Sequence, residues 1–249
     1  MERREALGVF GALGIGMAAG HADAADHPPA NPGAAGGNAG HAGNAAANRY
    51  MTPVTSTHAH FCGIHVAKRD PKFQLIVQHY CAPLGEEMHQ CLLYDSFERN
   101  AKLLGVEYIV SDRIYRTLPE REKIYWHPHT YEVLAGGLIA PGMPGADEMR
   151  FMKAIINTWG KTWHTWPDPR TPVPMGEPLL MWSATGDGQV SGDVISRRDR
   201  MFNVSAERIR DNRVREFGLE VPQVAQPRSL DQIGRQWTNE GDDRPTRRP

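Results

Sequence analysis

The sequence predicts an α+β protein: a single domain with a mostly antiparallel sheet packed by a few helices. Several short segments are rich in β-branched and aromatic residues and are bounded by Gly, Pro or Asp, which is typical of strands. The early strands follow one another directly, and helical segments come later in a mixture, which favours the α+β class. Charged residues make up 23% of the chain and hydrophobic residues 40%, as in soluble globular proteins.

Local composition and periodicity give the individual elements. The predicted strands are 56–66, 73–83, 88–95, 103–111, 130–139 and 179–185. The predicted helices, from the spacing of apolar residues, are 112–126, 146–163 and 205–217. Pro119 marks the regular start of the first helix, and Ser205 is the expected N-cap of the last.

The first residues resemble an export signal. Arg3 and Arg4 precede a weakly apolar stretch rich in Gly and Ala, and the A-x-A cleavage pattern Ala22-Asp23-Ala24 follows. The paired arginines are typical of the bacterial twin-arginine route. Residues 1–24 are therefore expected to be a twin-arginine signal peptide, and the protein is expected to be exported, periplasmic or extracellular.

The rest of the chain divides by composition. Residues 25–49 contain no Leu, Ile, Val or aromatic side chain, so they are expected to form a disordered linker. The globular domain is expected at 50–217, a length of about 170 residues that is ample for one core. Residues 218–249, with several prolines and few apolar residues, are expected to form a mostly disordered tail.

Charge and motif content exclude several functional classes. The net charge of −1 offers no footprint for nucleic acid or for an anionic membrane. The uncharged run 6–20 is shorter than the roughly 20 residues that a membrane-spanning helix needs. No G-x-S-x-G, H-E-x-x-H or Rossmann glycine pattern is present, and Gly160-Lys161-Thr162 lacks the upstream glycine of a P-loop.

A predicted hairpin brings histidines and cysteines together. With a three-residue loop at 85–87, Cys81 lies opposite Cys91, and His79 and His89 share their face because side chains alternate along a strand. Three interpretations stay open here: a cross-strand disulfide, a tetrahedral metal site, or two buried free thiols. A register shifted by one residue would place the pairs on opposite faces.

The segment 126–132 is a second candidate site. His127 and His129 fall on one side of an extended backbone, and H-x-H followed by Glu132 resembles the first metal motif of cupins. Only two residues separate His129 from Glu132, where cupins have three or four. The alternative is a hydrogen-bonded structural role in a buried turn.

Histidine clustering supports the metal interpretation. The chain has 11 histidines, and all of those in the expected globular domain lie between His58 and His164. Such clustering within one domain is suggestive of metal binding, and it leaves the cofactor open with a transition metal such as zinc as the candidate. The candidate metal ligands are His127, His129, Glu132, His79, Cys81 and His164.

Several long strings resemble the oil body-associated protein family, in the same order along the chain. They are Gln78-His79-Tyr80-Cys81, Gln90-Cys91-x-x-Tyr94-Asp95-Ser96, Asn100-Ala101-Lys102-Leu103, Trp126-His127-x-His129-x-Tyr131-Glu132-Val133 and Gly160-Lys161-Thr162-Trp163-His164-Thr165-Trp166. The family takes its name from plant members on seed lipid droplets and also has bacterial members. The resemblance implies no reaction and no catalytic residue.

Two hypotheses of function follow. The resemblance implies a non-enzymatic binding protein at a lipid or envelope surface, although the chain lacks a long apolar hairpin and any strong amphipathic helix. The alternative is a periplasmic metal-binding protein or metalloenzyme that uses the histidine-rich core.

Overall fold

The structure is a computed structural model that describes residues 51–68 and 70–223. The expected signal peptide, the linker and most of the expected tail lie outside the described residues. The described residues fall into two units: residues 51–57, with the short helix α1 (Thr52–Thr55), belong to the first, and residues 58–223 belong to the second. The second unit carries the sheet and every candidate metal ligand.

The second unit is built on a seven-stranded antiparallel sheet that closes on itself. Its strands are β1 (Ala59–Ala67), β2 (Gln74–Pro83), β3 (Met88–Tyr94), β4 (Leu103–Ser111), β5 (His127–Pro128), β6 (Thr158–His164) and β7 (Leu179–Trp182). They are ordered β4-β3-β2-β1-β7-β6, and β6 pairs again with β4 to close the circuit. The short strand β5 adds to β6. The predicted α+β class with a mostly antiparallel sheet is confirmed.

Strand β6 replaces the second half of the predicted helix 146–163, and this part of the prediction was wrong. The helix α5 (Gly145–Ile155) ends early, and the chain turns directly into β6. Thr158, Gly160, Thr162 and His164 are buried while the residues between them are not, which is the alternation of a strand. Trp159 stacks on Tyr115 with 3.6 Å between ring centroids. Trp159 and Trp163 are four residues apart, which is also the spacing of residues on one face of a helix.

The predicted strand 130–139 was also wrong, because the helix α4 (Thr130–Leu134) begins there. Four successive residues of α4 are buried, so its sequence shows no one-sided period that could separate a helix from a strand. Gly136, with φ of 74°, allows the chain to leave the helix in a left-handed conformation. Only Ile139 makes a sheet contact, as an isolated bridge to Cys62.

The predicted helix 112–126 is two short helices, α2 (Asp112–Thr117) and α3 (Glu120–Lys123), which meet at Pro119. The helix α7 (Ala206–Phe217) confirms the last prediction, with the Ser205 side chain accepting a hydrogen bond from the backbone of Arg208. The helix α6 (Gly192–Phe202) was not predicted, since its sequence is dominated by charged residues. None of the helices in the described residues is both long enough and apolar enough to cross a bilayer.

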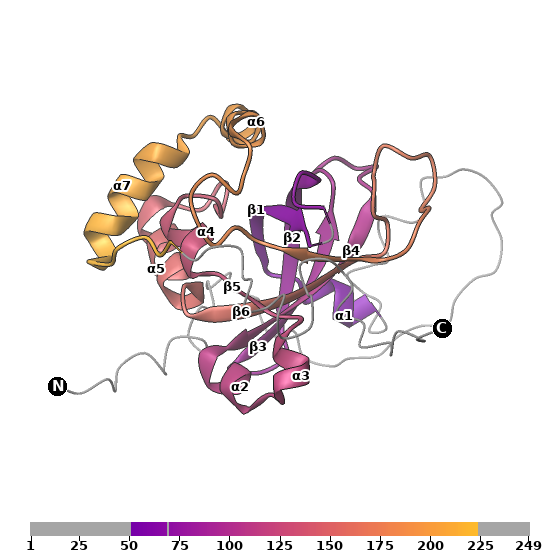
Figure 1. Cartoon of the computed structure of the whole chain (residues 1–249), viewed down its shortest axis with the longest axis horizontal. Helices are drawn as coiled ribbons and strands as arrows, with labels where there is room; N and C mark the ends of the chain where they lie inside the picture. Colours follow the sequence, from indigo (N-terminus) through magenta and orange to yellow (C-terminus); the bar gives the residue numbers. More distant parts are fainter. Residues whose placement is uncertain (1–50, 69, 224–249) are drawn as a thin grey trace, which may run out of the picture. The chain divides into compact units, whose positions relative to one another are not determined.

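Two buried arginines from these late helices fix the segment that follows α4. Arg198 of α6 donates to the carbonyls of Gly136 and Gly137 at 2.7 Å. Arg213 of α7 donates to the carbonyls of Val133 and Leu138 at 2.6 and 2.7 Å. Cations satisfy the free carbonyls at a helix C-terminus and interact favourably with its dipole. Helices α4, α5 and α7 accordingly lie together in Figure 1.

The hairpin of β2 and β3 has the predicted register, with Cys81 opposite Cys91, and the two cysteines form a disulfide. Their Cα atoms are 4.0 Å apart. Of the three open interpretations, the structure therefore shows the cross-strand disulfide. Cys62 is a buried free cysteine, and burial raises the pKa of its thiol to about 12.

This pairing predicts the outcome of a thiol titration. At pH 8 the native, unreduced protein is expected to react slowly with a thiol reagent, because the raised pKa of Cys62 leaves little reactive thiolate. Denaturation without reductant should then expose a single reactive thiol. Three thiols after denaturation would contradict the disulfide, and rapid labelling of the native protein would contradict the burial of Cys62.

Candidate metal centre

A cluster of buried titratable side chains lies inside the closed sheet. Its members come from five strands and from the start of α4, and their residues are 6% exposed or less: His65, His79, Glu107, His127, His129, Glu132 and His164. Burying polar groups away from water carries a large free-energy cost unless partners or a ligand satisfy them. The cluster therefore requires a structural or chemical explanation.

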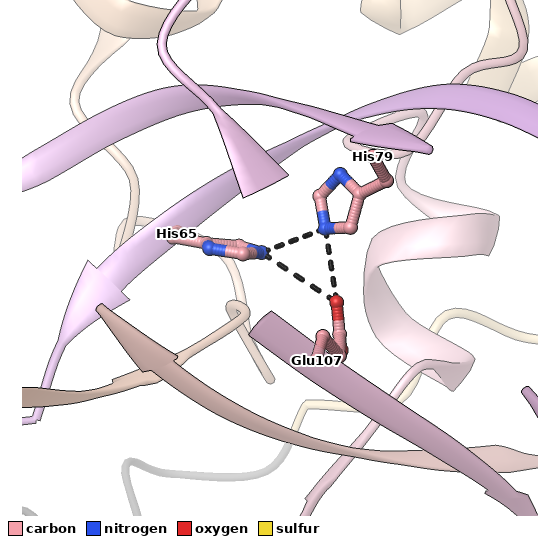
Figure 2. A group of neighbouring side chains, drawn as sticks. All are labelled: His65, His79 and Glu107. Atoms are coloured by element: carbon pink, nitrogen blue, oxygen red, sulfur yellow. Dashed lines mark hydrogen bonds and ion pairs between the residues drawn. The ribbon is translucent and has the colours of Figure 1, made fainter. Parts of the chain in front are cut away.

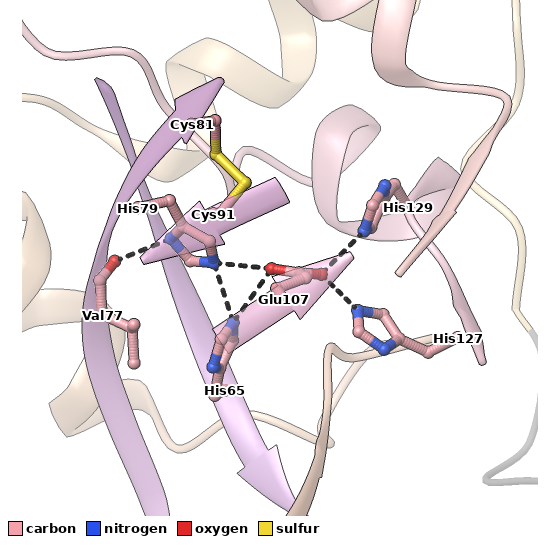
Figure 3. Close-up of a disulfide and its surroundings, with 8 residues drawn as sticks. All are labelled: His65, Val77, His79, Cys81, Cys91, Glu107, His127 and His129. Carbon is pink, nitrogen blue, oxygen red and sulfur yellow. Dashed lines mark hydrogen bonds and ion pairs between the residues drawn. A yellow bond between two sulfur atoms is a disulfide. The ribbon is translucent and has the colours of Figure 1, made fainter. Parts of the chain in front are cut away.

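Glu107 of β4 lies at the centre of the cluster (Figure 3). Its Oε2 is 2.9 Å from Nε2 of His79 and 4.0 Å from Nε2 of His65. Its Oε1 is 3.3 Å from Nε2 of His129 and 3.5 Å from Nε2 of His127. One carboxylate thus faces two pairs of histidines, each pair with a different oxygen.

The first of these groups is a compact triangle of ligand atoms (Figure 2). The Nε2 atoms of His65 and His79 are 3.0 Å apart, and both lie within 4.0 Å of Glu107 Oε2. Ligands bound tetrahedrally to Zn²⁺ at about 2.0–2.1 Å are separated from one another by roughly 3.3 Å. The three atoms already have nearly the spacing of one face of such a site.

Hydrogen bonds orient the two imidazoles of this triangle. Nδ1 of His79 is 3.2 Å from the carbonyl of Val77, which can only accept, so Nδ1 carries a proton and Nε2 is the nitrogen that faces Glu107. Nδ1 of His65 is 3.0 Å from Nε2 of His164. Such outer hydrogen bonds are what fix the ring orientation of metal-binding histidines.

The second group contains His127 and His129, beside Oε1 of Glu107. The hydroxyl of Thr158 donates to the carbonyl of Ile155 at 2.6 Å, so it accepts from Nδ1–H of His129 at 2.7 Å. This again leaves Nε2 of His129 directed at the carboxylate. Oε1 of Glu132 lies 3.8 Å from the same Nε2.

Burial and hydrogen bonds within the cluster shift the pKa values of its members in opposite directions. Burial alone would raise the pKa of Glu107, but hydrogen bonds from His129 and His79 hold it well below its usual range. Burial opposes the charged form of His129, yet the hydrogen bond to Glu107 and the nearby Glu132 raise its pKa. Burial lowers the pKa values of His127 and His164 to about 3. The lowered pKa of Glu107 and the raised pKa of His129 both favour a carboxylate paired with an imidazolium.

Two glycines leave the space that the cluster needs. A Cβ atom on Gly160 would lie 2.1 Å from Glu107 Oε1 and 2.7 Å from His129 Nε2. A Cβ atom on Gly63 would lie 3.3 Å from Cε1 of His79. The backbone of Gly160 approaches the cluster more closely than any residue with a Cβ would allow, and the backbone of Gly63 leaves only a tight fit.

A small cavity of about 50 Å³ reaches the edge of the cluster. Glu132 and Gly137 line one part of it, and Ile64, Ala184 and Arg198 line others. The cavity has room for water or an ion but not for an organic ligand. Glu132 is thus the cluster residue that this cavity reaches.

Comparison with known proteins identifies the family of this chain. A family described as "Protein of unknown function (DUF1264)" matches residues 51–216. Oil body-associated protein 1B of Arabidopsis thaliana is 39% identical over 178 residues, which cover 71% of this chain and 74% of that protein. Oil body-associated protein 1A of Zea mays is 39% identical over 171 residues, which cover 68% and 72%. The chain belongs to the oil body-associated protein family.

Family membership confirms the resemblance carried by the sequence strings. A further member, oil body-associated protein 2C of Arabidopsis thaliana, is 32% identical over 192 residues, covering 76% of this chain and 78% of its own. The family match spans the whole cluster, from His65 to His164. No solved structure matches the chain.

The structure brings most of the predicted ligands of this family member together. His79, His127, His129, Glu132 and His164 all lie in the cluster. Cys81 does not serve as a thiolate ligand, because its sulfur is bonded to Cys91.

Two cluster residues, His65 and Glu107, were not among the predicted ligands. The signal for Glu107 was a lone charged residue inside the apolar strand 103–111, where alternation places it on the same face as Gly105 and Ile109. His65 lies on the face of β1 that carries Phe61 and Gly63, opposite the face that carries His60.

The protonation of Glu132 predicts a pH-dependent stability. Burial raises its pKa to about 7, against the opposing effect of the charge on His129. In the unfolded chain a Glu has a pKa of about 4.3. Between that pH and the folded pKa, the folded protein holds a proton that the unfolded chain has released. The free energy of unfolding therefore falls as pH rises through this window. The Gln side chain of Glu132→Gln cannot titrate, so this variant should not lose stability as pH rises through the window.

The measurement is urea denaturation of both proteins, with a chelator present, at several pH values from acid to neutral. The unfolding free energy of Glu132→Gln relative to wild type is expected to rise by about 3 kcal/mol across the window. The exposed Glu98→Gln serves as the matched control and should show a constant difference. A flat or falling curve for Glu132→Gln would contradict the buried, protonated carboxyl.

Proposed function

We propose that this protein binds a transition-metal ion, with zinc as the first candidate, through His65, His79 and Glu107. The observation that carries the proposal is the triangle of two Nε2 atoms and one carboxylate oxygen, drawn from three different strands and buried together. Imidazole and carboxylate ligands suit zinc and several other first-row metals. Three protein ligands would leave a fourth position for water or another ligand, as in zinc sites that keep an open position.

Unpaired polar atoms around the cluster support the proposal. Among the described residues, His164 Nδ1, His127 Nδ1 and Thr162 Oγ1 are buried without a hydrogen-bond partner. Buried polar groups are nearly always paired, so a concentration of unpaired ones indicates a site that a ligand or ordered water completes.

Elemental analysis of the protein purified without an affinity tag, before and after incubation with Zn²⁺, tests the proposal. Wild type is expected to retain at least one equivalent of metal after dialysis, and His79→Asn is expected to lose the ion of this triangle. The control is His60→Asn, since His60 lies on the same strand as His65 but on its other face. Trace metal in the wild type after incubation would reject the proposal.

A second proposal concerns a lipid surface. It is supported by the names of the relatives, which associate those proteins with oil bodies. The structure adds a groove of about 380 Å³ in which apolar side chains lie beside cations. Phe73 and Met201 contribute apolar surface, and Lys72 and Arg197 contribute exposed positive charge. We infer that the groove binds an anionic lipid headgroup together with part of its acyl chain.

Flotation with anionic phospholipid vesicles at low salt tests the lipid proposal. Wild type should float with the vesicles, and the double variant Lys72→Glu/Arg197→Glu should not. Arg121→Glu, an exposed arginine outside the groove, is the control for net charge. Wild-type protein that stays at the bottom of the gradient would end this proposal.

We also propose export by the twin-arginine route. Support comes from the Arg3-Arg4 pair and from the disulfide between Cys81 and Cys91, since disulfides persist in oxidising compartments outside the cytoplasm. Replacing both arginines with lysine should trap the precursor inside the cell, as seen by fractionation. Continued export of that variant would instead indicate the general secretory route.

A further inference from the structure

We propose that Glu107 bridges two metal ions, the second held by His127 and His129, so that the cluster is a dinuclear centre. This inference rests on the proposed function, because it assumes that the first ion binds at His65 and His79. The geometry that carries it is the division of the carboxylate: Oε2 faces one pair of histidines and Oε1 faces the other. A carboxylate that bridges two metal ions binds one ion with each of its oxygens, so each oxygen must face a different set of ligands.

The second group has a donor set equivalent to the first. Nε2 of His127 and Nε2 of His129 lie 3.5 and 3.3 Å from Glu107 Oε1. These distances match the roughly 3.3 Å between ligands that share a tetrahedral ion. The two rings are edge to face, with centroids 5.2 Å apart, and both Nε2 atoms face Oε1 of Glu107.

A hydrogen bond favours the metal-binding tautomer of His129. Thr158 holds the proton of His129 on Nδ1, which frees Nε2 for an ion once the additional proton of the imidazolium leaves. Nδ1 of His127 has no partner among the described residues, and its Nε2 faces Glu107. Neither ring uses its Nε2 to bind a backbone group within the described part of the chain.

Gly160 supplies the room for the second ion. Its backbone pairs with Ile109 of β4 on one side and with His127 of β5 on the other. The position of an added Cβ falls 2.1 Å from Glu107 Oε1, 2.7 Å from His129 Nε2 and 2.8 Å from His127 Cε1. A methyl group there would compete with any ion for contact with these same three residues.

Glu132 is the further ligand available to this ion. Its Oε1 is 3.8 Å from Nε2 of His129, on the part of the cluster that the small cavity reaches. With Glu132 the second ion would have two imidazoles and two carboxylates, a donor set that zinc, manganese and iron accept. Ions that share such a site are typically about 3.5–4 Å apart.

Titration of the metal-free full-length protein with Co²⁺ tests the bridge. Cobalt is paramagnetic, so each bound ion gives a spin signal, and two ions bridged by one carboxylate couple and change that signal. Elemental analysis after dialysis should give two equivalents in the wild type. The low-temperature spin-resonance intensity should grow with the first equivalent and fall per cobalt with the second.

Variants assign the two positions. His129→Asn should retain one equivalent with an uncoupled signal, and His79→Asn should also lose one of the two. His60→Asn, the control on the outer face of β1, should keep both equivalents and the coupling. Circular dichroism of each variant separates loss of an ion from loss of the fold, and the wild-type titration does not depend on any variant.

The failures of the two proposals are distinguishable. One equivalent in the wild type, kept by His129→Asn and lost by His79→Asn, would overturn the second ion and leave the proposed function standing. Two equivalents with uncoupled signals would overturn the bridge, because the ions would then occupy separate sites. Trace binding in the wild type would overturn both.

Discussion

Glu107→Gln is expected to abolish metal binding at both positions, because the amide offers no charge and only one oxygen to two ions. Glu107 is the residue common to both ligand groups. Losing an outer hydrogen-bond partner of a metal ligand already weakens affinity by about 10–100-fold, so losing the shared ligand should exceed about 100-fold. Competition of each protein against a coloured chelator measures the change.

The same substitution should destabilise the metal-free protein. The pKa of Glu107 is held well below its usual range. Its carboxylate therefore stabilises the fold at any pH above the pKa of an unfolded Glu, which is about 4.3. This stabilisation is lost as pH falls through the folded pKa. Removing one partner from a buried ion pair costs about 3–5 kcal/mol at neutral pH. Denaturation of the metal-free proteins gives the value.

The matched control for both measurements is Glu98→Gln, the same chemical change at an exposed position. It should alter neither the affinity nor the free energy of unfolding. A Glu107→Gln protein that binds metal as tightly as wild type would show that Glu107 is not a metal ligand and would contradict the bridge.

Gly160→Ala is expected to remove the second ion and to destabilise the fold. The added methyl group would lie 2.1 Å from Glu107 Oε1, inside van der Waals contact, and it cannot move away because Gly160 is paired on both sides within the sheet. Overpacking of a closed core typically costs about 1–3 kcal/mol. Thermal denaturation and elemental analysis of the same preparation measure the two effects.

Gly145→Ala is the control for this substitution. Gly145 begins α5, and an added Cβ would meet nothing within 4 Å. The change should be neutral or stabilise the protein by up to about 1 kcal/mol, because alanine loses less backbone entropy than glycine in a helix. If Gly160→Ala behaved like Gly145→Ala and still bound two ions, the space at Gly160 would have no role in the site.

The sequence could predict the elements whose patterns are local. The register of the β2–β3 hairpin followed from the loop at 85–87 and placed Cys81 opposite Cys91, as the structure confirms. Strand β4 was predicted with its observed bounds, because turn residues and a β-branched apolar run define both ends. Ser205 identified the start of α7 through its side-chain cap.

The elements that could not be predicted depend on distant contacts. β6 has two tryptophans at helical spacing, and only its pairing with β4 and β7 makes them the outer face of a strand. α4 is buried on all sides and owes its ending to carbonyl contacts with Arg198 and Arg213, which lie more than sixty residues later. Propensity is a weak prior, and such tertiary contacts override it.

The candidate site shows the same division. Histidine spacing indicated the residues near one another in the chain, such as His127 and His129. The central residue, Glu107, joins them only after β4 pairs with β6, which brings position 107 opposite Thr162 and beside β5. A lone glutamate has no spacing from which a metal motif can be identified.

The buried arginines of α6 and α7 also bear on when the frame of the proposed centre is complete during synthesis. The ligands of both groups are complete once the ribosome has passed His129, yet the segment after α4 keeps free carbonyls until Arg198 and Arg213 have emerged. A partly synthesised chain therefore contains the histidines before the segment after α4 has its hydrogen-bond partners. Affinity alone favours copper and zinc over most other divalent metals, so the ion that is captured depends on which metals surround the chain when folding is complete. If the protein crosses the membrane already folded, that choice is made in the cytoplasm, before the ion pool of the destination compartment can compete.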